Sequence, residues 1–325
     1  MKVYGDYFFQ DLASKLKEKG YTVYAPVKVK DYWLFRQVEP EQIELQDYTN
    51  TLKSAKEIVF PQNEILIKYG EWIEEVPSDN SKRVVIAVRM CDAKGIALLD
   101  KVFLEDFVDP YYKQRRENTL LVGLACRTAC DYGFCTSFNL GEGLDIIAYE
   151  INGGYALKAL TEKGEEALKL MDVRDADDEI RREVEEAEKK FRESFKRTID
   201  PAKVSEKMPE IFDSEYWKEI AMNCISCGAC TYLCPTCFCF DMLDEGEIRG
   251  IRYRCWDSCQ FPLYTLESSS HNPRPEKWQR LRNRFYDKFL YMLRRKGEYY
   301  CVGCGRCIEK CPAGIDIVEV LNGMR

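Results

Sequence analysis

Two short stretches of this sequence carry cysteines at a spacing that can hold an iron–sulfur cube. They span residues 224–235 and 301–312, and both follow the pattern C-x2-C-x2-C-x3-C-P. Three thiolates this close together reach one cube only if the chain between them wraps tightly. Small residues such as Gly228 and Gly305, directly after the second cysteine of each motif, suit such a wrap. We therefore expect two [4Fe-4S] clusters.

The fourth cysteine of each motif is expected to belong to the other cluster. In two-cluster ferredoxins this cysteine ligates the second cube, and the proline after it stiffens the exit of the chain. The crossed assignment gives one cluster Cys224, Cys227, Cys230 and Cys311, and the other Cys301, Cys304, Cys307 and Cys234. Structural zinc and a disulfide framework are the alternatives. Both are disfavoured, because the cluster spacing occurs twice and His271 is the only histidine.

Four further cysteines lie at or just after the ends of predicted strands in the N-terminal part of the chain. They are Cys91, Cys126, Cys130 and Cys135. Ligands gather at the carboxyl ends of strands in α/β sheets, so these thiols are candidates for a third [4Fe-4S] cluster, although they lack ferredoxin spacing. A zinc site is the main competing interpretation, and free buried thiols are the simplest one. Three thiols within ten residues of a loop favour a metal site.

The last four cysteines fit no standard ligand spacing. They are Cys237, Cys239, Cys255 and Cys259, arranged as C-x-C and C-x3-C. Cys237 and Cys239 follow Cys234 so closely that packing around its cluster is an alternative to ligating another metal. A fourth metal site stays open, and we assign these cysteines no ligand role.

The elements expected to position the N-terminal cysteines are strands and helices in alternation. The predicted strands share a period-two or near-continuous apolar pattern and lie at residues 21–30, 32–37, 64–68, 83–90, 119–124, 145–151 and 155–160. Asn152-Gly153-Gly154 predicts a hairpin between the last two strands. Helical spacing of apolar residues predicts helices at 6–19, 92–103 and 176–197. Residues 83–124 therefore form a strand–helix–strand unit.

The fold class that we expect is α+β, in two domains. Residues 1–199 form an α/β-type domain with a mixed sheet, and residues 200–325 form a helix-rich domain with the two clusters. The boundary is placed at Ile199-Asp200-Pro201, where the helical pattern breaks. The segment between the motifs is too long for the hairpin of a minimal ferredoxin and contains a predicted helix at 276–297. The second domain should therefore be like the α-helical ferredoxin domains of larger redox complexes.

Composition and missing motifs restrict the function further. The 325 residues include 16 cysteines, and the start of the chain shows no apolar signal segment, so we expect a reducing, cytoplasmic environment. No apolar run approaches the roughly 18 residues of a membrane span. The net charge of −7 argues against a nucleic-acid partner. No dinucleotide fingerprint, P-loop or nucleophile elbow is found, so we expect no flavin on this chain and a role in relaying single electrons.

Several motifs resemble a known family. They are Arg-Met-Cys-Asp at 89–92, Leu-Leu-Asp-Lys-Val-Phe-Leu at 98–104, Tyr-Tyr-Lys-Gln-Arg-Arg-Glu at 111–117, Cys-Pro-Thr-Cys-Phe-Cys-Phe-Asp at 234–241, and Trp-Asp-Ser-Cys at 256–259 leading to His-Asn-Pro-Arg-Pro at 271–275. Together they resemble the dicluster iron–sulfur family that includes the beta subunits of sulfhydrogenases and the A subunits of anaerobic sulfite reductases. The resemblance covers most of residues 83–325.

The resemblance implies an electron-transfer subunit of a larger oxidoreductase. Its partners would be a flavoprotein that handles NAD(P)H and a catalytic subunit that is hydrogenase-like or reduces a sulfur compound. An aldehyde oxidoreductase, a heterodisulfide-linked system and direct substrate reduction at the N-terminal cysteines are the alternatives. The family pattern of the N-terminal site ends in Cys-Phe-Cys, whereas this chain has Gly133-Phe134-Cys135. Cys130 would then stand in as the fourth ligand.

Overall fold

The computed structural model describes residues 1–76 and 79–324, and the chain forms two compact units. The first unit comprises Met1–Val59, Ser78–Asp131 and Asn139–Lys196, and the second comprises Phe60–Pro77, Tyr132–Phe138 and Arg197–Arg325. The domain boundary expected at residues 199–200 lies near the start of the last segment. Sequence patterns did not indicate that the two earlier segments belong with it.

An eight-stranded mixed sheet forms the centre of the first unit, in the order β10-β1-β9-β8-β7-β6-β2-β3. Its strands are β1 (Lys2–Tyr4), β2 (Thr22–Val29), β3 (Tyr32–Gln37), β6 (Arg83–Val88), β7 (Thr119–Leu124), β8 (Ile146–Ile151), β9 (Gly154–Ala159) and β10 (Arg174–Asp175). The four inner strands β2, β6, β7 and β8 are parallel, and the outer pairs are antiparallel. Every residue of β6 and β7 is buried, as their continuous apolar runs predicted.

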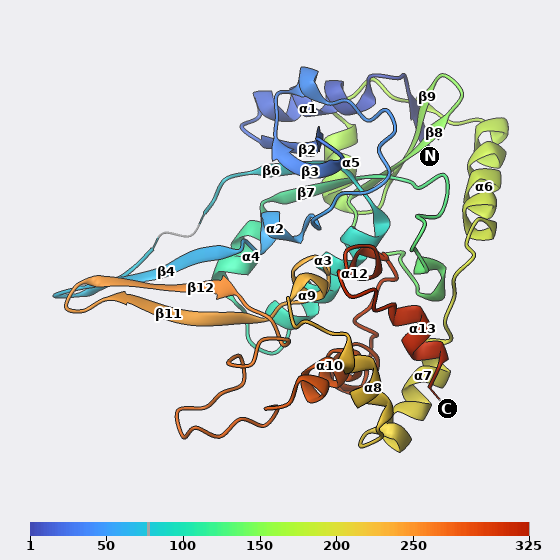
Figure 1. Cartoon of the computed structure of the whole chain (residues 1–325). Coiled ribbons are helices and arrows are strands. Elements are labelled where there is room, and N and C mark those ends of the chain that lie inside the picture. Colours follow the sequence, from blue (N-terminus) through green and yellow to red (C-terminus); the bar gives the residue numbers. More distant parts are fainter. Residues whose placement is uncertain (77–78, 325) are drawn as a thin grey trace. The chain divides into compact units, whose positions relative to one another are not determined.

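Helices cover this sheet. They are α1 (Phe8–Glu18), α2 (Lys56–Val59), α3 (Met90–Phe103), α4 (Pro110–Glu117), α5 (Glu162–Leu168) and α6 (Asp178–Glu193), with a short 3-10 turn at Pro40–Gln42. Phe8 and Leu12 of α1 share one apolar core with Val84 and Val122 of the sheet. The helix α3 packs on β7, so the predicted strand–helix–strand unit is confirmed (Figure 1).

The second unit contains a four-stranded antiparallel sheet that sequence patterns did not predict. Its order is β11-β12-β4-β5, from β4 (Asn63–Tyr69), β5 (Ile73–Glu75), β11 (Phe240–Gly246) and β12 (Gly250–Trp256). Figure 1 shows β11 and β12 as a long hairpin beside β4. The sequence pattern predicts residues 64–68 as a strand of the N-terminal sheet, and this placement is wrong, because β4 pairs with β12, far away in the sequence. Glu64 of β4 accepts a buried hydrogen bond of 2.8 Å from Arg254 of β12.

Short helices make up the rest of the second unit. They are α7 (Pro201–Lys207), α8 (Tyr216–Met222), α9 (Ala229–Tyr232), α10 (Lys277–Tyr286), α11 (Met292–Lys296), α12 (Arg306–Glu309) and α13 (Ile317–Asn322), with 3-10 turns at Cys135–Ser137 and Met208–Ile211. A π-helical turn, Asp287–Tyr291, joins α10 to α11, so the helix predicted at 276–297 is confirmed but interrupted. Trp217, Phe285 and Phe289 lie in the apolar core of this unit. The likeness to α-helical ferredoxins stays a prediction.

No helix within residues 1–76 and 79–324 combines the length and the apolar character that a membrane crossing requires.

Candidate metal centres

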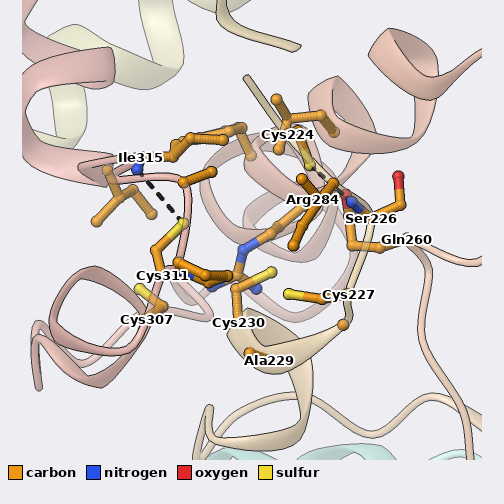
Figure 2. Close-up of a pocket in the computed structure, with 17 residues that line it drawn as sticks. Cys224, Ser226, Cys227, Ala229, Cys230, Gln260, Arg284, Cys307, Cys311 and Ile315 are labelled. Atoms are coloured by element: carbon orange, nitrogen blue, oxygen red, sulfur yellow. Dashed lines mark hydrogen bonds between the residues drawn. The ribbon is translucent and has the colours of Figure 1, made fainter. Parts of the chain in front are cut away.

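The first predicted ligand set lines one pocket of the second unit. Its cysteines come from both motifs: Cys224, Cys227 and Cys230 from the first, and Cys311 from the second (Figure 2). The two motifs meet because α9, which contains Cys230, contacts α12, which contains Cys307. The pocket also includes Cys307 and the side of α10 that carries Arg284. The crossed ligand assignment stays a prediction, and this arrangement is compatible with it.

Two glycines give both motifs the same tight turn. Gly228 has φ +76° and Gly305 has φ +77°, in the left-handed region, and each directly precedes a short helix. A Cβ atom at Gly305 would lie 2.6 Å from the backbone of Tyr132, and one at Gly228 would lie 2.9 Å from the ring of Phe261. Space and backbone conformation therefore both require glycine here.

Donor groups around the pocket fit an iron–sulfur cluster. The backbone N–H of Ser226 donates to Cys224 Sγ at 3.4 Å, and that of Ile315 donates to Cys311 Sγ at 3.3 Å (dashed lines in Figure 2). The Arg284 side chain points into the pocket, and its buried Nη2 has no hydrogen-bond partner among the described residues. Hydrogen bonds to the sulfurs are a normal part of cluster sites, so a cluster would supply the acceptor that Arg284 lacks.

The second predicted ligand set is buried in the same unit. Burial raises the pKa of Cys304 to about 11, Arg306 partly opposes this, and the negative charge of Cys234 adds to it. Burial also raises the pKa of Cys301 and of Cys307, and Cys234 again contributes. Cys234 is therefore close enough to act on all three cysteines at the start of the second motif, although it belongs to the first motif in sequence.

A buried lysine contacts Cys234. Lys288, in the π-helical turn, is 2% exposed, and its Nζ lies 3.2 Å from Cys234 Sγ and 3.5 Å from Cys237 Sγ. The same ammonium donates to Thr236 Oγ1 and to the Tyr300 carbonyl, both at 3.0 Å. Burial alone would lower the pKa of Lys288, but the interaction with the sulfur atoms of Cys234 and Cys237 raises it above its ordinary value. The lysine is therefore charged.

The four cysteines without an assigned role are also in the second unit. Cys237 lies beside Cys234 and receives a contact of 3.7 Å from Arg284 Nη1. A hydrogen bond from Cys259 lowers the pKa of Cys239 to about 6, although burial opposes this shift. Cys255 lies on β12, opposite Asp241 of β11. Cys237 is thus the one of the four with contacts to both buried cations.

The N-terminal thiols gather around a buried arginine of the first unit. Burial opposes the charge of Arg89, yet the charges of Cys126, Cys130 and Cys91 help to raise its pKa. Its guanidinium donates to the carbonyls of Leu124 and Ala125 at 3.0 Å each, at the carboxyl end of β7, and to further carbonyls at residues 48–49. Arg89 therefore holds the loop of Cys126 and Cys130 against the sheet.

A cavity of about 330 Å³ lies beside these thiols and is lined by Cys126, Cys130 and Arg89. Cys91 is buried in the first turn of α3, so it follows the end of β6 as predicted. Cys135 belongs to the second unit, in the 3-10 turn Cys135–Ser137. A third cluster on Cys91, Cys126, Cys130 and Cys135 stays a prediction. Among the residues that the structure describes, no three Cys, His, Asp or Glu side chains lie close enough together to bind a single metal ion.

The chain is similar to known iron–sulfur proteins. A family model described as a 4Fe-4S dicluster domain matches residues 223–315, which contain both cysteine motifs. The whole chain is 34% identical over 333 aligned positions to Sulfhydrogenase 2 subunit beta of Pyrococcus furiosus, and the match covers 100% of this chain and 98% of that protein. The chain therefore belongs to the dicluster iron–sulfur family of sulfhydrogenase beta subunits, as its motifs indicated. No solved structure matches it.

Sequence reasoning missed Arg284 and Lys288. The helix at 276–297 is predicted from its apolar stripe alone, which includes Leu281, Phe285 and Phe289. Arg284 and Lys288 lie four residues apart, directly beside that stripe, so they are on the buried side of the helix. Two cations on the buried side of a helix between two cysteine motifs are a sequence signal for positive charge near the clusters.

Proposed function

We propose that this chain is the electron-transfer subunit of a multi-subunit oxidoreductase. It relays single electrons between a flavoprotein that handles NAD(P)H and a catalytic subunit that is hydrogenase-like or reduces a sulfur compound. The observation that carries the proposal is the pocket lined by Cys224, Cys227, Cys230 and Cys311, with a buried donor of Arg284 directed into it. The relative from Pyrococcus furiosus is named as a sulfhydrogenase subunit, which supports this type of complex.

The proposed cofactors are two [4Fe-4S] clusters and a third one in the N-terminal site. Their ligands are the two crossed sets of the motifs and, for the third, Cys91, Cys126, Cys130 and Cys135. Each bound cluster stores and releases one electron at a time. The chain itself supplies thiolates, backbone N–H donors, buried positive charge and exclusion of water.

A partner is required because NAD(P)H delivers a hydride, whereas clusters exchange single electrons. A flavin is the usual converter between the two. We propose that the flavin is on another chain, since this sequence has no nucleotide-binding fingerprint.

The test uses the anaerobically purified chain. We expect it to take up electrons from a low-potential chemical reductant, which is measured as bleaching of the cluster absorbance. It should show no NAD(P)H oxidation until a flavoprotein partner is added. Flavin in the purified chain, with bleaching by NAD(P)H alone, would contradict the proposal.

The cavity beside Cys126 and Cys130 favours one second candidate, reduction of a small substrate at the N-terminal site. In that case the site would keep an iron position open for substrate. Candidate oxidants, such as sulfite, polysulfide or a disulfide, would then reoxidise the reduced chain in the absence of partners. Replacing Cys130 with serine should abolish this reaction if the second candidate is correct.

A further inference from the structure

Two buried cations lie one helical turn apart between the predicted cluster sites. Arg284 is the last basic residue of α10 and is 4% exposed, and Lys288 in the π-helical turn is 2% exposed. Like charges four residues apart on a helix repel each other, and burial removes the water that would screen them. Such an arrangement needs negative charge nearby.

Lys288 contacts a cysteine of the second set, whereas Arg284 lies near cysteines of both sets, including Cys230 and Cys307. Arg284 lines the pocket of Cys224, Cys227, Cys230 and Cys311, and its Nη2 has no hydrogen-bond partner among the described residues. Lys288 Nζ instead contacts Cys234 Sγ at 3.2 Å. Cys237 lies between them, 3.7 Å from Arg284 Nη1 and 3.5 Å from Lys288 Nζ.

Lys288 is held in place at both of its ends. Its carbonyl accepts a hydrogen bond of 2.8 Å from the backbone N–H of Tyr300, and its ammonium donates to the Tyr300 carbonyl at 3.0 Å. Thr236 donates to the same carbonyl at 2.5 Å. Tyr300 directly precedes Cys301, the first cysteine of the second motif, so the lysine is fixed relative to that motif.

We propose that the two cations set the reduction potentials of the clusters: Lys288 acts mainly on the cluster of Cys234, Cys301, Cys304 and Cys307, and Arg284 acts most strongly on the cluster of Cys224, Cys227, Cys230 and Cys311, whose pocket it lines, and more weakly on the other. The inference rests on the ligand sets of the proposed function. Reduction adds one negative charge to a cluster, and a fixed positive charge beside it stabilises the reduced form. The potential of each cluster is therefore higher than it would be without its cation.

The test is a potentiometric titration of the whole chain followed by electron paramagnetic resonance. Cys311→Ser and Cys234→Ser first identify which signal belongs to which ligand set. We expect Lys288→Met to raise the oxidised-to-reduced ratio of the Cys234 cluster at a fixed potential by tenfold or more, which is a downward shift of the reduction potential of at least about 59 mV. Arg284→Met should lower the reduction potential of the Cys224 cluster more than that of the Cys234 cluster. Lys288→Arg keeps the positive charge, so it should shift both reduction potentials by much less than Lys288→Met shifts that of the Cys234 cluster.

A matched control removes the same charge from the surface. Lys203 of α7 is exposed and pairs with Asp200, so Lys203→Met should leave both potentials unchanged. If Lys288→Met loses its cluster, Lys288→Gln and Lys288→Arg are compared by iron content. Retention in the arginine variant alone supports a need for positive charge, and loss in all three variants overturns the proposal.

Unshifted potentials in variants that keep both clusters also overturn the proposal, while leaving the proposed function intact. Fewer than about 8 iron atoms in the unmodified chain would instead contradict the proposed function itself.

Discussion

The two groups of cysteines differ in what their buried cation does. In the first unit, the guanidinium of Arg89 donates to four backbone carbonyls, and its hydrogen bond to Cys126 opposes the rise that burial causes in the pKa of that thiol. In the second unit, Arg284 Nη1 contacts Cys237 Sγ and Lys288 Nζ contacts Cys234 Sγ. Arg89 therefore has four backbone acceptors besides the thiols, Lys288 has one, at Tyr300, and the buried Nη2 of Arg284 has no hydrogen-bond partner among the described residues.

The difference indicates that the two units depend on metal to different degrees. The sheet of the first unit has its own apolar core, in which β6 and β7 are fully buried. The second unit also has an apolar core, but α10 carries buried charges into the space between the motifs. Buried charge without its counter-charge is strongly destabilising. Loss of the clusters should therefore unfold part of the second unit first.

Metal removal should have the largest effect on this comparison. Chelation of iron under anaerobic conditions is expected to remove amide exchange protection from α10 and α12 and to leave β6 and β7 protected. The reason is that Arg284 and Lys288 would remain buried without the negative charge of the clusters. Hydrogen–deuterium exchange with mass spectrometry measures both regions in one sample. Equal loss of protection in β7 and α10 would contradict the difference between the units.

Single cysteine substitutions separate the three predicted clusters. Cys234→Ser should remove about 4 of about 12 iron atoms and the signal of the cluster on Cys301, Cys304 and Cys307. It should also destabilise the protein by about 1–3 kcal/mol, because Lys288 loses its contact with Cys234 and keeps those with Thr236 and Tyr300. Iron analysis, resonance spectra and denaturant unfolding are the measurements.

Two further variants control this experiment. Cys126→Ser should also remove about 4 iron atoms, but with both motif signals unchanged. Cys255→Ser, on β12, should leave iron content unchanged. About 8 irons and one zinc in the unmodified chain would show that the N-terminal site holds zinc instead. Loss of the Cys224 signal in Cys234→Ser would contradict the crossed ligation.

Much of the first unit could be predicted from sequence because its signals are local. The strands β2, β3, β6 and β7 and the hairpin β8–β9 were all predicted close to their observed bounds. The sheet of the second unit could not be predicted, because β4 pairs with β12 across a long stretch of chain and most of β11 is exposed. Exposed strands lack the apolar alternation that identifies a strand.

The candidate sites follow the same rule. The motifs at 224–235 and 301–312 were identified by spacing, and they do meet at one pocket. The sequence places Arg284 and Lys288 beside the apolar stripe, but the cysteines that they contact depend on how α10 continues through a π-helical turn, which no local pattern signals.

Substitutions in the two apolar cores test, with a smaller expected effect, whether iron retention depends on the second unit more than on the first. Phe8 and Phe285 are both buried, in the cores of the first and second unit respectively, and alanine at either position should cost about 3–5 kcal/mol. Phe285 also lines the pocket of Cys224 and Cys311. Phe285→Ala should therefore speed the loss of iron to a chelator, whereas Phe8→Ala should not, as stopped-flow bleaching can show. Equal bleaching rates in the two variants would contradict a special dependence of the second unit.

The smallest expected effect concerns two glycines with positive φ. Gly153, in the turn between β8 and β9, has φ +82°, and a Cβ there would meet no atom within 4 Å. Gly303, in the second motif, has φ +63°, and a Cβ there would lie 2.6 Å from the backbone of Cys135. Alanine at position 153 therefore faces only the left-handed conformation, whereas alanine at position 303 also faces a clash.

Gly153→Ala should lower the free energy of unfolding by about 1 kcal/mol, because the strain of the left-handed residue is partly offset by the lower entropy of the unfolded chain. Iron content and both cluster signals should stay unchanged. Gly303→Ala should instead reduce iron content, since its Cβ would clash with the backbone of Cys135 and the motif would have to shift to relieve that clash. Denaturant unfolding measures the cost of the left-handed conformation in each variant, and iron analysis shows whether the clash at position 303 also disturbs the motif. Iron loss in Gly153→Ala would mean that the clusters depend on the sheet of the first unit as well.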